Sequence, residues 1–379
     1  MKKIIPYGKQ YIDANDVKAV SSALKNDKIT TGPLVKKFEY VIKSYTKSKF
    51  ALSCNSGTSA LYLAFQSLEL KKNDIVVMPS INFVSSYNIA KIFQAKVYLA
   101  DVDPFTGQMT PNDVINCCKK FKLKKIKILV TMYNGGYPQN SHLFKNFKKK
   151  FGCYIVEDAC HALGATYKLN KKNYMIGSCA HSDISTFSFH PLKSITTGEG
   201  GALTTNSKKI YDKLVVLRTI GIKRSNNHWE YDINEFGLNF RLSDIQCALG
   251  ISQFKKLNNF IKKRKKISNI YDTKLRDEKN IFIVNHKKNF NSAFHLYFLK
   301  FKNFDINKKN KLFKYMKKKG VILQYHYIPI YKFKIFKDKY IGKNAEKFYK
   351  NTITLPIYFT LKKQQQEYII NELKNFFDK

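Results

Sequence analysis

Residues 187–201 read FSFHPLKSITTGEGG, in which one lysine, Lys193, stands between a strand-like aromatic run and a glycine-rich turn. A lysine amine attacks a carbonyl only when it is partly deprotonated, and burial or a neighbouring charge can arrange this. The glycines let the backbone approach a bound group closely, and Ser188 offers a hydroxyl to a phosphate. The segment can therefore hold an aldehyde cofactor as a Schiff base. In isolation, a surface lysine before a turn explains it better, so the case depends on the rest of the chain.

Short apolar runs alternate with amphipathic stretches through the first two thirds of the chain. We expect strands at 50–54, 75–78, 95–100, 126–133, 153–158, 184–189 and 202–205, and helices at 13–25, from 57 onward, at 83–92 and at 142–150. Apolar strands separated by helices are typical of an α/β domain with a largely parallel, buried sheet. The sequence predicts such a large domain over residues 1–250.

Beyond residue 250 the composition shifts toward lysine-rich helices. We expect a long helix at 251–274, strands at 294–298 and 321–327, and helices at 340–351 and 362–377. These elements predict a smaller α+β domain over residues 251–379. A length of 379 residues is sufficient for two such domains.

The formal net charge of +41 by itself favours nucleic acid or an anionic membrane surface as a partner. Nearly all of the positive charge is lysine, and arginine occurs only at Arg218, Arg224, Arg241, Arg264 and Arg276. Because arginine is the usual residue for bidentate contacts with phosphates and bases, its scarcity weakens that interpretation. The spread of lysine beside abundant Ile, Asn, Phe and Tyr is typical of an AT-rich genome. We therefore expect no nucleic-acid or membrane partner, and a basic nucleic-acid-binding or regulatory protein is kept as the alternative of another class.

The seven cysteines form neither a CxxC pair nor a cluster with zinc spacing. Reduced thiols in the cytosol are the simplest explanation. The N-terminal residues lack the apolar stretch of a signal peptide, and no run of about 18 uncharged apolar residues could span a membrane. We expect a soluble, cytoplasmic protein without a metal site.

Three further segments supply what a pyridoxal phosphate site needs: an acid for the ring nitrogen, an anchor for the phosphate and a ring to stack on the cofactor. Asp158 ends an apolar strand, where its carboxylate can meet the pyridinium nitrogen or simply cap a helix. Ser56-Gly57-Thr58-Ser59 lies between a strand and a helix, where amides and hydroxyls can point at a phosphate, although many such turns only cap helices. Phe83 follows a Pro79-Ser80 break and can stack on the ring or belong to the core.

The order of these segments is more specific than any one of them: phosphate loop, aromatic residue, acid, lysine. With the other motifs it resembles the DegT-type sugar-nucleotide aminotransferases over essentially the whole chain, from Tyr7 to about Pro356. The motifs that carry the resemblance are Tyr7-Gly8-Lys9-Gln10, Thr31-Gly32-Pro33, residues 55–61, residues 157–164, residues 237–246 and the Lys193 run.

The resemblance implies a pyridoxal-phosphate-dependent transferase of fold type I, with a mixed, mostly parallel sheet flanked by helices and a smaller C-terminal α+β domain. It implies that Lys193 forms the Schiff base and shuttles the proton, and that Asp158 pairs with the pyridine nitrogen. The other implied cofactor contacts are Phe83 on the ring, His161 near the ring oxygen, Gly57, Thr58 and Ser188 at the phosphate, and Asn239 reaching in from the second subunit of a homodimer with shared sites.

Within the family, residues 324–331 are most similar to enzymes of pseudaminic acid biosynthesis that aminate C4 of a UDP-4-keto-6-deoxy-N-acetylhexosamine, with L-glutamate as the expected donor. The implied substrate contacts are Tyr7, Asp27, Lys28, Ile29, Thr30, Ser56, Gln324, Tyr325, His326 and Tyr327. One branch of the family has histidine in place of the lysine and performs dehydration, so Lys193 favours transamination. Residues 134–137, Asn-Gly-Gly-Tyr, depart from the Tyr-Gly or Ala-Gly turn common in relatives. Another keto-sugar nucleotide, of the perosamine or bacillosamine type, remains the alternative acceptor.

Overall fold

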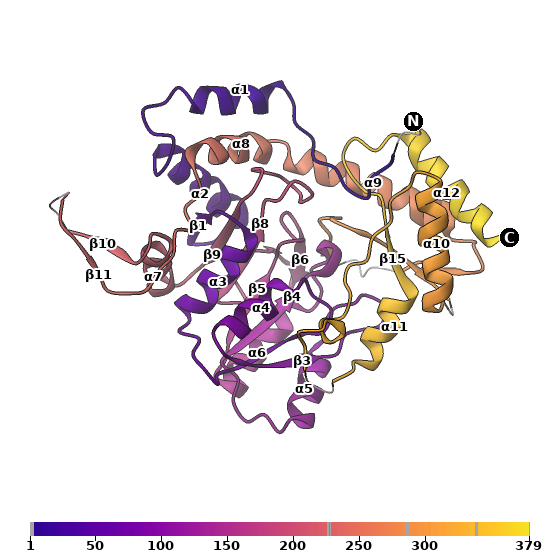
Figure 1. Ribbon diagram of the computed structural model, residues 1–379, viewed down its shortest axis with the longest axis horizontal. Helices are drawn as coiled ribbons and strands as arrows, with labels where there is room; N and C mark the ends of the chain where they lie inside the picture. Colours follow the sequence, from indigo (N-terminus) through magenta and orange to yellow (C-terminus); the bar gives the residue numbers. More distant parts are fainter. Residues whose placement is uncertain are drawn as a thin grey trace.

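The computed structural model of the chain describes residues 4–225, 227, 229–284, 289–302, 304–337 and 340–378 (Figure 1). Within these residues a seven-stranded sheet has the spatial order β1-β9-β8-β5-β4-β2-β3. Its strands are β1 (Phe50–Cys54), β2 (Ile75–Pro79), β3 (Lys96–Ala100), β4 (Ile128–Met132), β5 (Tyr154–Asp158), β8 (Ile184–Ser188) and β9 (Gly201–Thr205). The pairs from β8 through β5, β4 and β2 to β3 are parallel, whereas β9 is antiparallel to both β1 and β8. The expected mixed, mostly parallel sheet is confirmed.

Both faces of this sheet are buried, as its nearly continuous apolar strands require. Two successive residues of β4, Leu129 and Val130, pack into different hydrophobic clusters on the two faces of the sheet. Val130 packs with helices α3 (Gly57–Ser67), α4 (Ser85–Ile92) and α7 (Lys208–Arg218). Leu129 packs on the other face with α5 (Pro111–Lys120) and α6 (Lys145–Phe151), which follows the 3-10 turn Ser141–Phe144. A third cluster places α2 (Pro33–Thr46) and α8 (Asp244–Phe254) beside β8 and β9.

The C-terminal part has a buried cluster of its own. It contains α9 (Leu257–Leu275), α10 (Ile306–Lys318), α12 (Lys363–Phe377) and the antiparallel sheet β12-β14-β15, whose strands are Ile281–Phe282, Tyr297–Phe301 and Thr352–Leu355. Helix α11 (Lys343–Asn351) precedes β15. The division of the chain into two domains at residue 250 stays a prediction.

The N-terminal segment connects the two parts. Ile5 belongs to the C-terminal cluster and pairs with Val321, and the carbonyl of Tyr7 accepts a hydrogen bond from the Ile357 amide. Helix α1 (Ala14–Ala23) then lies along α8 (Figure 1). As expected, Asp13 caps α1: its carboxylate accepts from the Asn15 and Asp16 amides.

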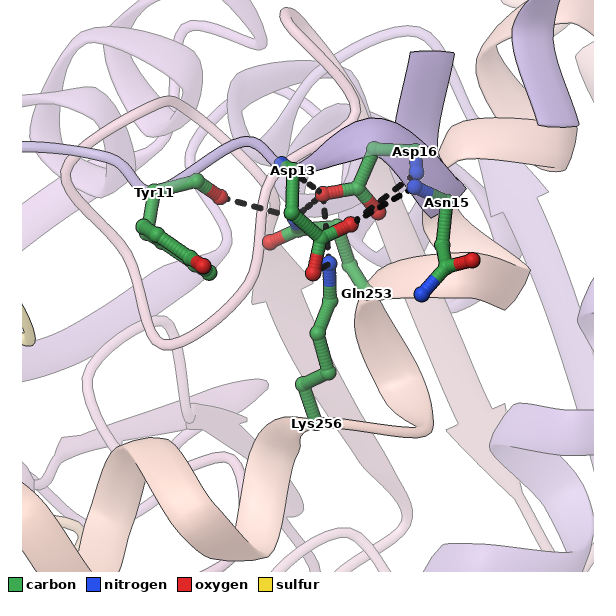
Figure 2. A network of polar contacts seen from close by, with 6 residues as sticks. All are labelled: Tyr11, Asp13, Asn15, Asp16, Gln253 and Lys256. Carbon is green, nitrogen blue, oxygen red and sulfur yellow. Dashed lines mark hydrogen bonds and ion pairs between the residues drawn. The ribbon is translucent and has the colours of Figure 1, made fainter. Parts of the chain in front are cut away.

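The expected single helix at 251–274 is wrong, because α8 and α9 are separate helices with the break at residues 255–256. At this break the Lys256 ammonium lies 2.9 Å from an Asp13 oxygen and 2.5 Å from an Asp16 oxygen (Figure 2). Gln253 donates to the same Asp16 carboxylate and to the carbonyl of Tyr11. These tertiary contacts stop the helix where its sequence carries no capping signal.

Two expected strands also differ from the structure. The strand predicted at 294–298 is β14, which begins three residues later, because Phe294 has a positive φ of 49° and the carbonyl of His295 accepts a hydrogen bond from Arg264. Residues 321–327 form only isolated bridges, of Val321 with Ile5 and of Gln324 with Thr354. Val321 and Gln324 pair with two different segments, the N-terminal Ile5 and Thr354 of β15, and neither pairing continues into a ladder.

Several elements had no expectation from the sequence. They are α2, α5, α7 and α10, the strands β12 and β15, the 3-10 turns Asn134–Gly136 and Ile330–Lys332, the sheet of β13 (Phe290–Asn291), β6 (Thr166–Leu169) and β7 (Lys172–Met175), and the hairpin of β10 (Ile222–Arg224) and β11 (Tyr231–Ile233). The β10–β11 hairpin projects away from the rest of the molecule (Figure 1). No helix among the described residues combines the length and the apolarity needed to cross a bilayer.

Candidate active site

A cavity of about 280 Å³ lies where β1, β2, β4, β5 and β8 end. The carboxyl ends of parallel strands meet at one edge of a sheet, which is where open α/β sheets bind ligands. Eleven of the predicted site residues line this cavity together: Tyr7, Ser56, Gly57, Thr58, Phe83, Asp158, His161, Ser188, Lys193, His326 and Tyr327. The sheet topology therefore gathers residues that are more than 300 positions apart in the sequence.

Lys193 and Asp158 are the two charged groups expected to do the chemistry. Asp158 is 3% exposed and accepts a hydrogen bond of 3.2 Å from the Cys160 amide. Burial raises the pKa of the Asp158 carboxyl and lowers the pKa of the Lys193 ammonium. The lysine amine is therefore closer to its nucleophilic, deprotonated form than an exposed lysine would be.

The turn between β1 and α3 forms an anion cradle. Ser56 caps α3 by accepting from the Ser59 amide, and in the described chain the Gly57 and Thr58 amides have no hydrogen-bond acceptor. A Cβ atom on Gly57 would lie 2.8 Å from the Cβ of Ser188, so only glycine lets this turn approach the end of β8. The Thr58 hydroxyl lies 3.1 Å from the hydroxyl of Ser85, the first residue of α4. Free amides at a helix N-terminus beside three hydroxyls fit a phosphate group.

Aromatic and imidazole rings form another part of the cavity wall. Phe83 is 52% exposed at the cavity and its ring centroid lies 5.7 Å from that of Tyr327. The imidazole of His161 lies 4.2 Å from that of His295, and the Tyr7 ring lies 5.5 Å from the His326 ring. Burial lowers the pKa of all three histidines, that of His326 to about 3, so this wall is uncharged at neutral pH.

The remaining predicted residues lie outside this cavity of the single chain. Residues 27–30 (Asp27, Lys28, Ile29 and Thr30) are exposed at the start of α8, where the Asp244 amide donates to the carbonyl of Ile29. Gln324 bonds to Thr354, and Tyr325 stacks on Phe313. Asn239 is exposed, and its carbonyl accepts from the side chain of Asn55.

The cavity also contains residues that sequence reasoning missed as site residues: Leu61, Ser85, Met132, Cys160, His190, Leu192, Glu199 and His295. Ser85 carried a usable signal, because a hydroxyl at the start of a helix after Phe83 repeats the pattern of the first phosphate turn. His295 carried none, since it was assigned to a strand and arrives from the C-terminal part of the chain. Within the described residues, no group of three or more His, Cys, Asp or Glu side chains is arranged to hold a metal.

Comparison with known proteins assigns this geometry to a family. Residues 10–374 match the DegT/DnrJ/EryC1/StrS aminotransferase family. The chain belongs to this family. It is 36% identical over 393 aligned positions to the UDP-4-amino-4,6-dideoxy-N-acetyl-beta-L-altrosamine transaminase of Campylobacter jejuni serotype O:23/36, covering 99% of this chain and 98% of that protein.

Solved structures agree with the family assignment. Helicobacter pylori PseC, an aminotransferase involved in the biosynthesis of pseudoaminic acid, superposes with a TM-score of 0.92 at 27% identity, covering 99% of this chain and 100% of PseC. The PLP-form of the putative sugar aminotransferase Spr1654 from Streptococcus pneumoniae superposes with a TM-score of 0.90 at 25% identity and covers 99% of each chain. The protein is a pyridoxal-phosphate-dependent sugar aminotransferase, and the fold-type-I expectation is confirmed.

The cavity fits this cofactor. The unpaired amides of Gly57 and Thr58 suit its phosphate, and Asp158 at the end of β5 suits its ring nitrogen. Lys193 is the one lysine among the described residues that line the cavity. Because the chain belongs to an aminotransferase family, the alternative that it only binds nucleic acid is excluded.

Proposed function

We propose that the protein transfers an amino group from L-glutamate to C4 of a UDP-4-keto-6-deoxy-N-acetylhexosamine, in the biosynthesis of pseudaminic acid. The observation that carries the proposal is the likeness, over nearly the whole of both chains, to the altrosamine transaminase of C. jejuni. Residues 324–327 support it, since His326 and Tyr327 line the cavity beside the cofactor residues. The net charge of +41 favours attraction of a diphosphate substrate.

Each group in the cavity has a proposed task. When bound, pyridoxal phosphate supplies the carbonyl that carries the amino group and the ring that stabilises negative charge next to it. Lys193 holds the cofactor covalently and moves the proton, because burial leaves its amine partly deprotonated. Asp158 keeps the ring nitrogen protonated, and burial of its carboxyl strengthens that pairing.

The other residues bind and orient. The Gly57 and Thr58 amides with the Ser188 hydroxyl hold the phosphate. Phe83 stacks on the ring, and His161 lies on the side of the ring oxygen. Tyr7, Ser56, His326 and Tyr327 face the sugar nucleotide. Residues 27–30, Gln324 and Tyr325 lie farther out and contact its nucleotide part. In this proposal the cavity binds the reacting end of the substrate and the outer residues bind the rest.

The active form in this proposal is a homodimer in which Asn239 of the partner subunit completes each phosphate site. Support comes from the β10–β11 hairpin and the residues after it, which expose large apolar side chains on a projecting element: Tyr231, Ile233, Phe236 and Leu238. Phe236 is 95% exposed, and such a patch is typical of a surface that another chain covers. A cytoplasmic location is proposed with it, since all seven cysteines are free.

The visible absorption spectrum of the purified protein with pyridoxal phosphate tests the reaction. The bound cofactor should give a yellow band that bleaches on addition of L-glutamate and returns with the UDP-4-keto sugar. A panel of amino acids and of keto-sugar nucleotides, including perosamine-type and bacillosamine-type precursors, separates donor and acceptor. Return of the band with one of the other sugars, and not with the proposed one, contradicts the acceptor assignment.

A further inference from the structure

The 3-10 turn Asn134–Gly136 follows β4 and bonds to two residues of the cavity wall, the imidazole of His161 and the backbone carbonyl of His326. The Gly135 amide donates a hydrogen bond of 3.3 Å to Nδ1 of His161. The Asn134 side-chain amide donates one of 3.2 Å to the carbonyl of His326, the residue before Tyr327. Asn134 is 2% exposed, so these contacts are made inside the protein and away from water.

The first contact fixes the tautomer of His161. A nitrogen that accepts from an amide N–H cannot carry a proton, so in the neutral ring the proton is on Nε2. Nε2 lies 2.8 Å from the hydroxyl oxygen of Tyr327, and it therefore donates to that oxygen. His161 is 2% exposed and its ring faces Lys193, His295 and His326, so burial and these neighbours keep it neutral by holding its pKa well below the usual value.

The hydrogen bond between His161 and Tyr327 determines where the Tyr327 hydroxyl proton points. Because the oxygen accepts from His161, the hydroxyl proton must point elsewhere, and in the described chain no acceptor for it is present. Tyr327 lines the cavity, so the open direction is toward a bound molecule. Burial raises the pKa of this phenol well above its usual value, which keeps the proton in place at neutral pH.

We propose that the Asn134–Gly136 turn directs a hydrogen-bond relay, from Gly135 N–H to His161 and from His161 to Tyr327, so that Tyr327 presents its hydroxyl proton to an oxygen of the molecule bound in the cavity. Tyr327 is the group that touches the bound oxygen, and Asn134 and His161 are positioning residues. This inference rests on the proposed function only for the source of the oxygen, which is either the cofactor ring or the keto group of the sugar.

Nitrogen-15 NMR of the full chain with ring-labelled histidine tests the tautomer without any substrate. His161 should give one protonated nitrogen, Nε2, and one unprotonated nitrogen, Nδ1, unchanged from about pH 5 to pH 8, and its signals are assigned by their loss in His161→Gln. A proton on Nδ1, or a ring that titrates in this range, overturns the relay. This experiment contains no substrate, so its result does not depend on which sugar is the acceptor. The hydrogen-bond relay can therefore be refuted without refuting the proposed function, and the reverse also holds.

Kinetics of the two half-reactions locate the bound oxygen. Tyr327→Phe and His161→Leu should each slow the affected step about tenfold, whereas His161→Gln, which keeps an acceptor and a donor in one side chain, should restore most of the rate. If the oxygen belongs to the cofactor, Tyr327→Phe shifts the pH at which the absorption band of the loaded protein changes. If it belongs to the sugar, the band is unchanged and only amination of the sugar slows.

The matched control for these kinetics is Tyr40→Phe, which removes a hydroxyl from a residue that is 66% exposed. This control should leave both the band and the rates as they are in the unaltered protein. Unchanged spectra and unchanged rates in Tyr327→Phe contradict the proposal, and the Gln variant of His161 keeps the test valid if the Leu variant does not fold.

Discussion

The carboxyl group of Asp158, at the end of β5, and the amine of Lys193, in the loop after the adjacent parallel strand β8, line one cavity, and each opposes the pKa shift that burial imposes on the other. Burial raises the pKa of Asp158, and the lysine charge lowers it; burial lowers the pKa of Lys193, and the carboxylate raises it. The two groups are therefore electrostatically coupled before any ligand binds. Their separate contributions can be measured by removing one at a time.

Replacing Asp158 with Ala should leave cofactor attachment intact and lower the rate of amination by at least about 100-fold, since the ring nitrogen loses the anion that keeps it protonated. The absorption band measures attachment, and a coupled assay of 2-oxoglutarate measures turnover. Turnover equal to that of the unaltered protein would mean that the acid lies elsewhere.

Replacing Lys193 with Ala should abolish turnover without unfolding the protein. The lysine makes no ion pair among the described residues, and the cost of burying its charge opposes its attraction to the Asp158 carboxylate, so its loss should leave the fold intact. Thermal unfolding checks stability, and Lys36→Ala, on the exposed face of α2, is the control for the loss of a lysine side chain as such. Ordinary activity in the Lys193 variant would refute the assignment of the catalytic lysine.

Mixed dimers test whether the sites are shared. If Asn239 serves the partner subunit, a dimer of one Lys193→Ala chain and one Asn239→Ala chain has one site with both changes and one site with neither. Mixing the inactive Lys193→Ala protein with the impaired Asn239→Ala protein should then restore activity, at up to one intact site per mixed dimer. If Asn239 acts within its own chain, both sites stay impaired and no activity returns.

Lys309 gives a pH dependence with a definite sign. This lysine of α10 is fully buried, contacts the rings of Tyr325 and Tyr349, and has its pKa lowered by burial to about 7. Because the unfolded chain holds this proton up to about pH 10, it binds more protons than the folded chain between about pH 7 and pH 10. The free energy of unfolding contributed by this group therefore rises with pH in that window.

Lys309→Met should accordingly be more stable than the unaltered protein at pH 7, by a few kcal/mol at about 1.4 kcal/mol per pKa unit. The difference should shrink toward about pH 10. Denaturant unfolding at a series of pH values measures it, with the exposed Lys311→Met of the same helix as the control. A difference that grows with pH would show the opposite sign and contradict the expected titration.

The junction of α8 and α9 offers a stability test. Asp16 is fully buried and its carboxylate depends on Lys256 and Gln253 for partners (Figure 2). Lys256→Met should destabilise the protein by about 3 kcal/mol, because it leaves a buried carboxylate without its cation. The exposed neighbour Lys255→Met should change the free energy of unfolding by less than about 0.5 kcal/mol. Equal effects of the two substitutions would show that the ion pair does not hold the junction.

The sequence predicted the central sheet well, because its strands are apolar runs whose burial needs no distant information. All seven were expected within about two residues of their observed ends, as β1 at residues 50–54 illustrates. Lys193, Asp158 and the Gly57-Thr58 turn line one cavity for a related reason: Asp158 ends a strand, the other two lie in short motifs after one, and strand ends converge in a parallel sheet.

What the sequence did not reveal depends on contacts between distant segments. His295 reaches the cavity only through the packing of the C-terminal part, and the break at Lys256 depends on aspartates about 240 residues earlier. The alternation at residues 321–327 predicted a strand, yet only two isolated bridges form, and they join Val321 and Gln324 to two different segments. The hydrogen bonds of the Asn134–Gly136 turn likewise cannot be predicted from the local sequence, because their partners, His161 and His326, are distant along the chain.

The segment from Ile5 to Asp13 is fixed at both ends, by the pairing of Ile5 with Val321 and by the docking of α1 on α8, and Tyr7 enters the cavity between them. The number of residues between the two anchors therefore sets the position of Tyr7 in the cavity. One inserted or deleted residue changes the reach of this segment by about 3.5 Å, more than a hydrogen bond tolerates. Enzymes that share both anchors should therefore tolerate exchanges of side chains in this segment far better than changes in its length.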